Sequence, residues 1–99
     1  MKKKSLKEIE KNIRSHFNSL ESRYFVKKIG IFGSYAKNSQ SAKSDIDILV
    51  RFSRPVGFFH FIDTKNYLTR ILKNKIDLVT PNALKPPIKK RILHQVKYI

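Results

Sequence analysis

Apolar residues in the first part of the chain recur every three or four positions, which is the spacing of one face of an α-helix. They are Leu6, Ile9, Ile13, Phe17 and Leu20. Ser5 precedes this series and Glu8 stands three residues later, which is the pattern of a capping box at a helix N-terminus. The spacing therefore predicts one amphipathic helix of about four turns that begins after Ser5.

Three later stretches are typical of β-strands, because they are rich in β-branched and aromatic residues and end at turn-forming residues. They are Lys27–Phe32 ("KKIGIF"), Asp45–Phe52 ("DIDILVRF") and Lys75–Thr80 ("KIDLVT"). Between the first two, Ser34 is expected to cap a short helix that carries Tyr35 and Ala36. A polar loop then leads into the second strand.

Two more helices are predicted, one on each side of the third strand. The first carries the apolar residues between positions 58 and 72, and we expect Asn74 to end it in the left-handed conformation that Asn tolerates. The second follows Pro87, which suits a first helical turn, and its apolar stripe consists of Ile88, Ile92 and Val96, with Leu93. The alternation of strands and helices favours an α/β (α+β) fold, a small mixed β-sheet layered with helices, and 99 residues suit one domain over residues 1–99.

Charge narrows the choice of partner. The chain has 22 Lys and Arg against 7 Asp and Glu, a formal net charge of +15. The excess indicates a polyanionic or acidic partner, although a soluble surface rich in lysine is the alternative. Because there is no cysteine, disulfides and zinc thiolate sites are excluded. No apolar run is long enough for a signal peptide or a membrane span, so we expect a cytoplasmic protein without a membrane segment.

Three of the four aspartates occupy matched positions on two predicted strands. Residues two apart in a strand share a face, so Asp45 and Asp47 lie together while the apolar residues that alternate with them form the core face. Asp77 alternates with apolar neighbours in the same way. If the third strand lies beside the second, the three carboxylates converge.

Converging carboxylates repel one another unless a cation neutralises them, and they are ligands that Mg²⁺ prefers. Three of them around one or two divalent ions would form a phosphoryl-transfer site. A solvated strand end, with lysines as counter-charges, is the alternative for the Asp-x-Asp pattern alone. Gly33 and Ser34 extend the candidate site, because glycine admits a ligand close to the backbone and the start of a helix favours phosphate oxygens. An ordinary strand-to-helix turn is the alternative for that pair.

These residues carry a resemblance to a known family. The run "IFGSYAKNSQSAKSDIDILV" resembles the signature of the DNA polymerase beta-like nucleotidyltransferases. The segments "PVGFF" and "KIDLVTPNALKPPIKKRIL" make the chain similar to the minimal nucleotidyltransferases (MNT) within that superfamily. The resemblance implies an antitoxin of HEPN/MNT toxin–antitoxin modules. It would use Mg²⁺ to transfer AMP from ATP to a tyrosine hydroxyl of a HEPN ribonuclease toxin, with which it would form a hetero-oligomer.

The resemblance also implies roles for individual residues. Gly33, Ser34 and Lys37 would bind the nucleotide. Asp45 and Asp47 would hold Mg²⁺, and Asp77 would be a third metal ligand or the base that activates the acceptor hydroxyl.

The chain departs from the family pattern at two places. Lys37-Asn38 stands where the family usually has Arg-Gly, and Lys73-Asn74 stands where it often has Gly-Arg. Asn is enriched at positive φ, so we expect both turns to persist. Lysine keeps the positive charge of arginine but lacks its planar fork.

Two other functions remain open from the sequence. One is a non-catalytic antitoxin that neutralises its partner by contact, and the other is a nucleic-acid-binding protein, which the charge of +15 suggests. His16, His60 and His94 lack metal-ligand spacing and are expected to be structural or surface residues. The aromatic residues Phe58, Phe59 and Phe61 are expected in the core rather than as a base-stacking platform, with a partner interface as a further possibility.

Overall fold

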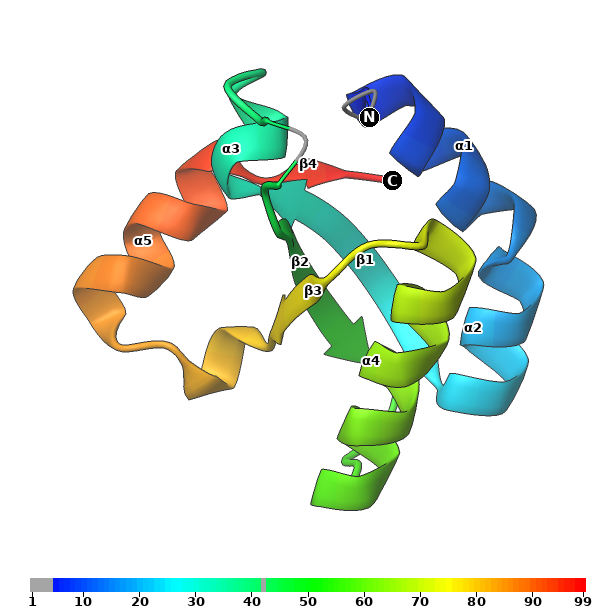
Figure 1. Ribbon diagram of the computed structural model, residues 1–99. Coiled ribbons are helices and arrows are strands. Elements are labelled where there is room, and N and C mark those ends of the chain that lie inside the picture. Colours follow the sequence, from blue (N-terminus) through cyan, green and yellow to red (C-terminus); the bar gives the residue numbers. More distant parts are fainter. Residues whose placement is uncertain (1–4, 42) are drawn as a thin grey trace.

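The computed structural model describes residues 5–41 and 43–99, in which a four-stranded sheet lies between helices on both of its faces (Figure 1). The elements are α1 (Leu6–Ser15), α2 (Phe17–Tyr24), β1 (Val26–Phe32), α3 (Gly33–Ala36), β2 (Ile46–Phe52), α4 (Phe58–Leu72), β3 (Ile76–Val79), a 3₁₀ turn (Pro81–Ala83), α5 (Pro86–Gln95) and β4 (Lys97–Tyr98). In these segments, no helix combines the length and apolar character needed to cross a membrane.

The sheet has the strand order β3-β2-β1-β4. β1 pairs antiparallel with β2 and with β4, whereas β2 and β3 are parallel, so the expected mixed sheet is confirmed. The short strand β4 was not predicted from the sequence. It pairs with Gly30 and Ile31, and a side chain on Gly30 would lie only 2.5 Å from Val96.

The main hydrophobic core fills the space between the sheet and helices α1, α2 and α4. From β2 it receives Ile46, Ile48 and Val50, all fully buried, which confirms the predicted core face of that strand. A smaller cluster lies on the opposite face, where Ile92 of α5 covers Phe32 and Leu49. The face of β2 that carries Asp47 is therefore covered by α5 in its middle and left open at its ends.

The prediction of one continuous N-terminal helix is wrong, because the chain breaks at His16. That residue leaves helical geometry (φ −108°, ψ 7°), and its Nδ1 donates to the carbonyl of Asn12 at 2.9 Å. The start of the helix is as predicted, since the Ser5 hydroxyl accepts a hydrogen bond from the backbone N–H of Glu8 at 3.2 Å.

The end of α4 also differs from the prediction. Lys73, not Asn74, adopts the left-handed conformation, with φ 50°. The Asn74 side chain instead donates a hydrogen bond to the carbonyl of Ser44 at 3.1 Å. This bond ties the turn before β3 to the segment that leads into β2.

The aromatic residues at the start of α4 do not all enter the core. Phe58 and Phe59 are 71% and 82% exposed, so the prediction of a core role is wrong for both. Phe61 is half-buried and packs against the main core, as expected. The first turn of α4 extends past the edge of the sheet (Figure 1), which leaves no layer to cover the two exposed rings.

Candidate active site

Asp47 and Asp77 are direct partners across the parallel strands β2 and β3. Cα atoms of such neighbours are separated by roughly 5 Å. Asp45 lies two residues before Asp47, at the entrance to β2. The structure thus brings the three aspartates of the sequence prediction to one end of the sheet, where β2 and β3 begin.

The charges of these side chains act on one another. The pKa of Asp47 is raised from its usual 3.8 to about 6, first by partial burial and then by the negative charges of Asp77 and Asp45 beside it. A raised pKa means that the surroundings of Asp47 destabilise its ionised form. A cation bound beside it would remove that destabilisation.

Gly33 lies directly against the carboxylate of Asp47. It has φ +72°, a left-handed conformation that residues with a side chain rarely adopt. A Cβ atom at this position would collide with Oδ2 of Asp47. Because Phe32 is the register partner of Asp47, the chain turns from β1 into α3 directly beside the carboxylate, and only glycine fits there.

Ser34 and Lys37 lie in the short segment that follows. Ser34 is half-buried inside α3, whose N-cap is Phe32, so the prediction that Ser34 caps this helix is wrong. The Ser34 carbonyl accepts the backbone N–H of Ser39 at 2.9 Å and closes the loop. Lys37 is exposed at the end of α3, and Asn38 after it has φ 57°, as the sequence predicted for that turn.

Two residues that hold this site in place were not predicted from the sequence. The Tyr35 side chain is fully buried in the main core and anchors α3, and its burial raises the pKa of its hydroxyl. Asn74 holds the backbone of Ser44, the residue before Asp45. The partners of the Asn74 bond are 30 residues apart, so no local pattern could have shown it.

The donor chemistry of the site fits a hard divalent ion, since carboxylate oxygens are the ligands of Mg²⁺. Within residues 5–41 and 43–99, however, no three His, Cys, Asp or Glu side chains are grouped so that they could hold a metal ion. Mg²⁺ is usually bound through one or two carboxylates together with substrate phosphates, rather than by a complete protein cage. The Asp47–Asp77 pair matches that partial set of ligands.

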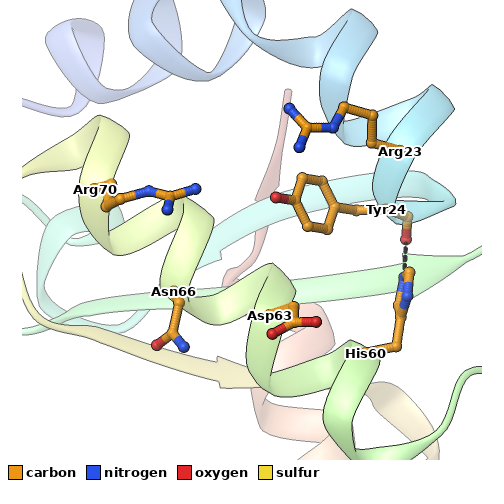
Figure 2. A pocket seen from close by; sticks show the side chains of 6 residues that line it. All are labelled: Arg23, Tyr24, His60, Asp63, Asn66 and Arg70. Atoms are coloured by element: carbon orange, nitrogen blue, oxygen red, sulfur yellow. Dashed lines mark hydrogen bonds between the residues drawn. The ribbon is translucent and has the colours of Figure 1, made fainter.

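A separate pocket of about 350 Å³ lies between α2 and α4, on the other side of the sheet from Asp47 (Figure 2). In it, Nε2 of His60 donates to the carbonyl of Tyr24 at 2.7 Å, and the guanidinium of Arg23 lies 5.6 Å from the centre of the Tyr24 ring. The His60 hydrogen bond joins α4 to the end of α2, so His60 has a structural role, as the sequence predicted.

Comparison with known proteins identifies the family. Residues 11–99 match the family model described as polymerase beta, nucleotidyltransferase. A Methanocaldococcus jannaschii protein, named provisionally as a protein adenylyltransferase, is 43% identical over 97 residues, which cover 97% of this chain and 99% of that protein. The protein adenylyltransferase MntA of Thermococcus cleftensis is 38% identical over 95 residues, 96% of each chain.

Solved structures show the same fold. A structure described provisionally as a minimal nucleotidyltransferase matches with a TM-score of 0.81 and 23% identity over 95% of both chains. A chain from the complex of a tri-AMPylated Shewanella oneidensis HEPN toxin with its MNT antitoxin matches with a TM-score of 0.66 and 21% identity, over 91% of this chain and 70% of that one. The resemblance seen in the sequence is confirmed, and the chain belongs to the polymerase beta nucleotidyltransferase family.

Proposed function

We propose that this protein is a Mg²⁺-dependent protein adenylyltransferase, an antitoxin that moves AMP from ATP onto a tyrosine hydroxyl of a HEPN ribonuclease toxin. The observation that carries the proposal is the pairing of Asp47 with Asp77 beside Gly33. Two neighbouring carboxylates with a close, side-chain-free approach are what a metal-bound triphosphate requires.

In this proposal Asp47 and Asp77 hold the metal together with oxygens of the triphosphate, and Asp45 adds a third negative charge nearby. Gly33, Ser34 and Lys37 contact the triphosphate. Mg²⁺, when bound, offsets the negative charge of the phosphates and of the departing pyrophosphate. The tyrosine oxygen forms a bond to the α-phosphorus as the bond to the β-phosphate breaks. The hydroxyl proton passes to Asp77 where that residue acts as the base.

The relatives support the class of acceptor and partner. The Thermococcus cleftensis relative is named as a protein adenylyltransferase, and similar folds occur in a complex of an MNT antitoxin with an AMPylated HEPN toxin. A further match is to a toxin–antitoxin structure with AMP-PNP, at a TM-score of 0.67 and 24% identity. We therefore propose a hetero-oligomer with a HEPN toxin, acting in the cytoplasm, where ATP is available.

The test is a transfer assay with the purified protein, a candidate HEPN toxin and Mg²⁺. ATP labelled on the α-phosphate should label the toxin, whereas ATP labelled on the γ-phosphate should not, because pyrophosphate leaves. Peptide mapping should find the AMP on tyrosine. Absence of label, or equal labelling by an Asp45→Ala/Asp47→Ala variant, would refute the transferase. If that variant still neutralised the toxin in cells, the protein would be an antitoxin that acts by contact alone.

A further inference from the structure

A large groove lies at the end of the sheet opposite the three aspartates. It has a volume of about 960 Å³ and receives five cationic side chains, Lys27, Lys28, Arg51, Arg54 and Lys89. We call it the basic groove. No acidic residue is found among the described residues that line it. Arg51 is four residues beyond Asp47 in β2, a separation of about 13 Å along a strand, so the basic groove and the carboxylates are separate sites.

A β-bulge shapes the groove. The pairing of β1 with β2 shifts between Val26 and Lys28, so that β1 contains one residue more than its partner. In a regular strand, neighbouring side chains point to opposite faces, and one of the two lysines would face the core. With the extra residue, Lys27 and Lys28 are both exposed. The bulge thus brings two adjacent positive charges to the surface.

Within residues 5–41 and 43–99, no ion pair joins a cation of the groove to a carboxylate. Lys28 is paired directly with Arg51 across the two strands, an arrangement of like charges that destabilises a sheet. The Lys28 Nζ lies 3.9 Å from the centre of the Tyr98 ring, and the Arg54 guanidinium lies 4.0 Å from that of Phe25. Aromatic rings position these side chains without cancelling their charge. An anion in the groove would relieve the repulsion.

The composition of the groove favours nucleic acid over an acidic protein surface. Three of its five cations are lysine, which is depleted at protein–protein interfaces. Single-stranded nucleic acids bind where a cationic groove meets aromatic rings on which bases stack. Tyr98, which is 40% exposed, lines the groove, whereas the ring of Phe52 packs against the main core. In the chain, Val56 of the groove wall is followed by Gly57 and by the exposed rings of Phe58 and Phe59. We propose that the basic groove binds single-stranded nucleic acid through its phosphates.

The test measures binding of fluorescent single-stranded RNA and DNA twelve-mers by anisotropy over a range of salt concentrations. The groove variant is Lys28→Gln/Arg51→Gln. The matched control is Lys7→Gln/Lys11→Gln, which removes the same charge from exposed positions on α1. We expect the groove variant to bind at least about tenfold more weakly at 100 mM salt, and its salt slope to fall by about 1.4, since each phosphate contact on a single strand contributes about 0.7. The control should change less than about twofold.

Thermal unfolding of both variants provides the check on folding. The groove variant should be at least as stable as the wild type, because it removes a like-charge pair. Equal weakening by the two variants would overturn the proposal, since binding would then depend on overall charge. Failure to bind either oligonucleotide at 100 mM salt would also overturn it. The proposal would also be overturned if the wild type bound poly-glutamate more tightly than the oligonucleotides and only the groove variant lost that binding. The groove would then fit an acidic protein. Binding of RNA alone, or of DNA alone, would support the proposal and identify the ligand.

Discussion

Asp77 stands directly beside Asp47 on parallel strands, and its negative charge raises the pKa of the Asp47 carboxyl. Aspartate is among the residues least suited to strands, and like charges side by side weaken a sheet. The cost is visible in the raised pKa of Asp47. The fold therefore contains a pair of carboxylates whose repulsion a bound cation would remove.

Stability should fall as the pH rises through the range in which Asp47 ionises. Its pKa is 3.8 in the unfolded chain and about 6 in the folded protein, so between these values the folded state keeps a proton that the unfolded state releases. Asp47→Asn removes this loss. In EDTA, the melting temperature of the variant should exceed that of the wild type at pH 7, and the difference should vanish near pH 3.5. Asp63→Asn, at an exposed position on α4, is the control, and its melting temperature should show no such pH-dependent difference from the wild type.

Mg²⁺ should stabilise the folded protein through the same residues. At a concentration ten times its Kd, an ion that binds only the folded state adds about 1.4 kcal/mol. We expect Mg²⁺ together with AMP-PNP to raise the melting temperature more than either alone, because phosphate oxygens complete the ligands that the carboxylates begin. NaCl of equal ionic strength controls for screening of the +15 charge. If Mg²⁺ raised the melting temperature of Asp77→Asn as much as that of the wild type, the ion would bind at another site.

Gly33→Ala should damage the fold and the site together. Left-handed backbone costs a residue with a side chain roughly 1–2 kcal/mol, and the new methyl group would also displace the Asp47 carboxylate. Urea unfolding should show at least that loss. Gly57→Ala is the matched control, since Gly57 has φ −80° and no atom lies within 4 Å of the added Cβ. We expect it to change the stability by less than about 1 kcal/mol. A Gly33→Ala protein as stable as the control would contradict the described geometry.

Local patterns predicted the parts of the fold that depend on alternation and on turn chemistry. Ile46, Ile48 and Val50 of β2 lie on the main core face because side chains alternate along a strand. The same alternation sets Asp47 on the other face, which it shares with Leu49. The adjacency of Asp77 followed from assuming that β3 lies beside β2, which the parallel pairing confirms. The Ser5 cap was visible for the same reason, because both partners of the bond are three residues apart.

Features that depend on distant partners were missed. β4 exists because Lys97 and Tyr98 meet Gly30 and Ile31, and two residues carry no pattern of their own. The break at His16 was hidden because apolar spacing continues through it. Phe58 and Phe59 are of a residue type that is usually buried. Both are exposed because the first turn of α4, which carries them, extends beyond the sheet. Repeat spacing describes one element and cannot show where a neighbouring layer ends.

Lys73 gives a test of the corrected end of α4. Its φ of 50° is a conformation that glycine adopts without strain. Lys73→Gly should therefore stabilise the protein by roughly 0.5–1 kcal/mol in urea unfolding. Lys11→Gly, in the regular geometry of α1, should instead destabilise it by about 1 kcal/mol. Loss of stability in Lys73→Gly would mean that other contacts of Lys73 outweigh the relief of backbone strain.

The most direct test of the central claim is intact-mass spectrometry of a HEPN toxin incubated with ATP, Mg²⁺ and one of three proteins. These are the wild type, Asp47→Asn and Asp63→Asn. We predict that the wild type and Asp63→Asn add AMP at equal rates. Asp47→Asn should be slower by at least about 100-fold. Loss of a residue that only hydrogen-bonds to a metal ligand already lowers activity by roughly 10- to 100-fold, and Asp47 is proposed to bind the metal itself. AMP transfer by Asp47→Asn at the wild-type rate, or no transfer by the wild type, would contradict the account.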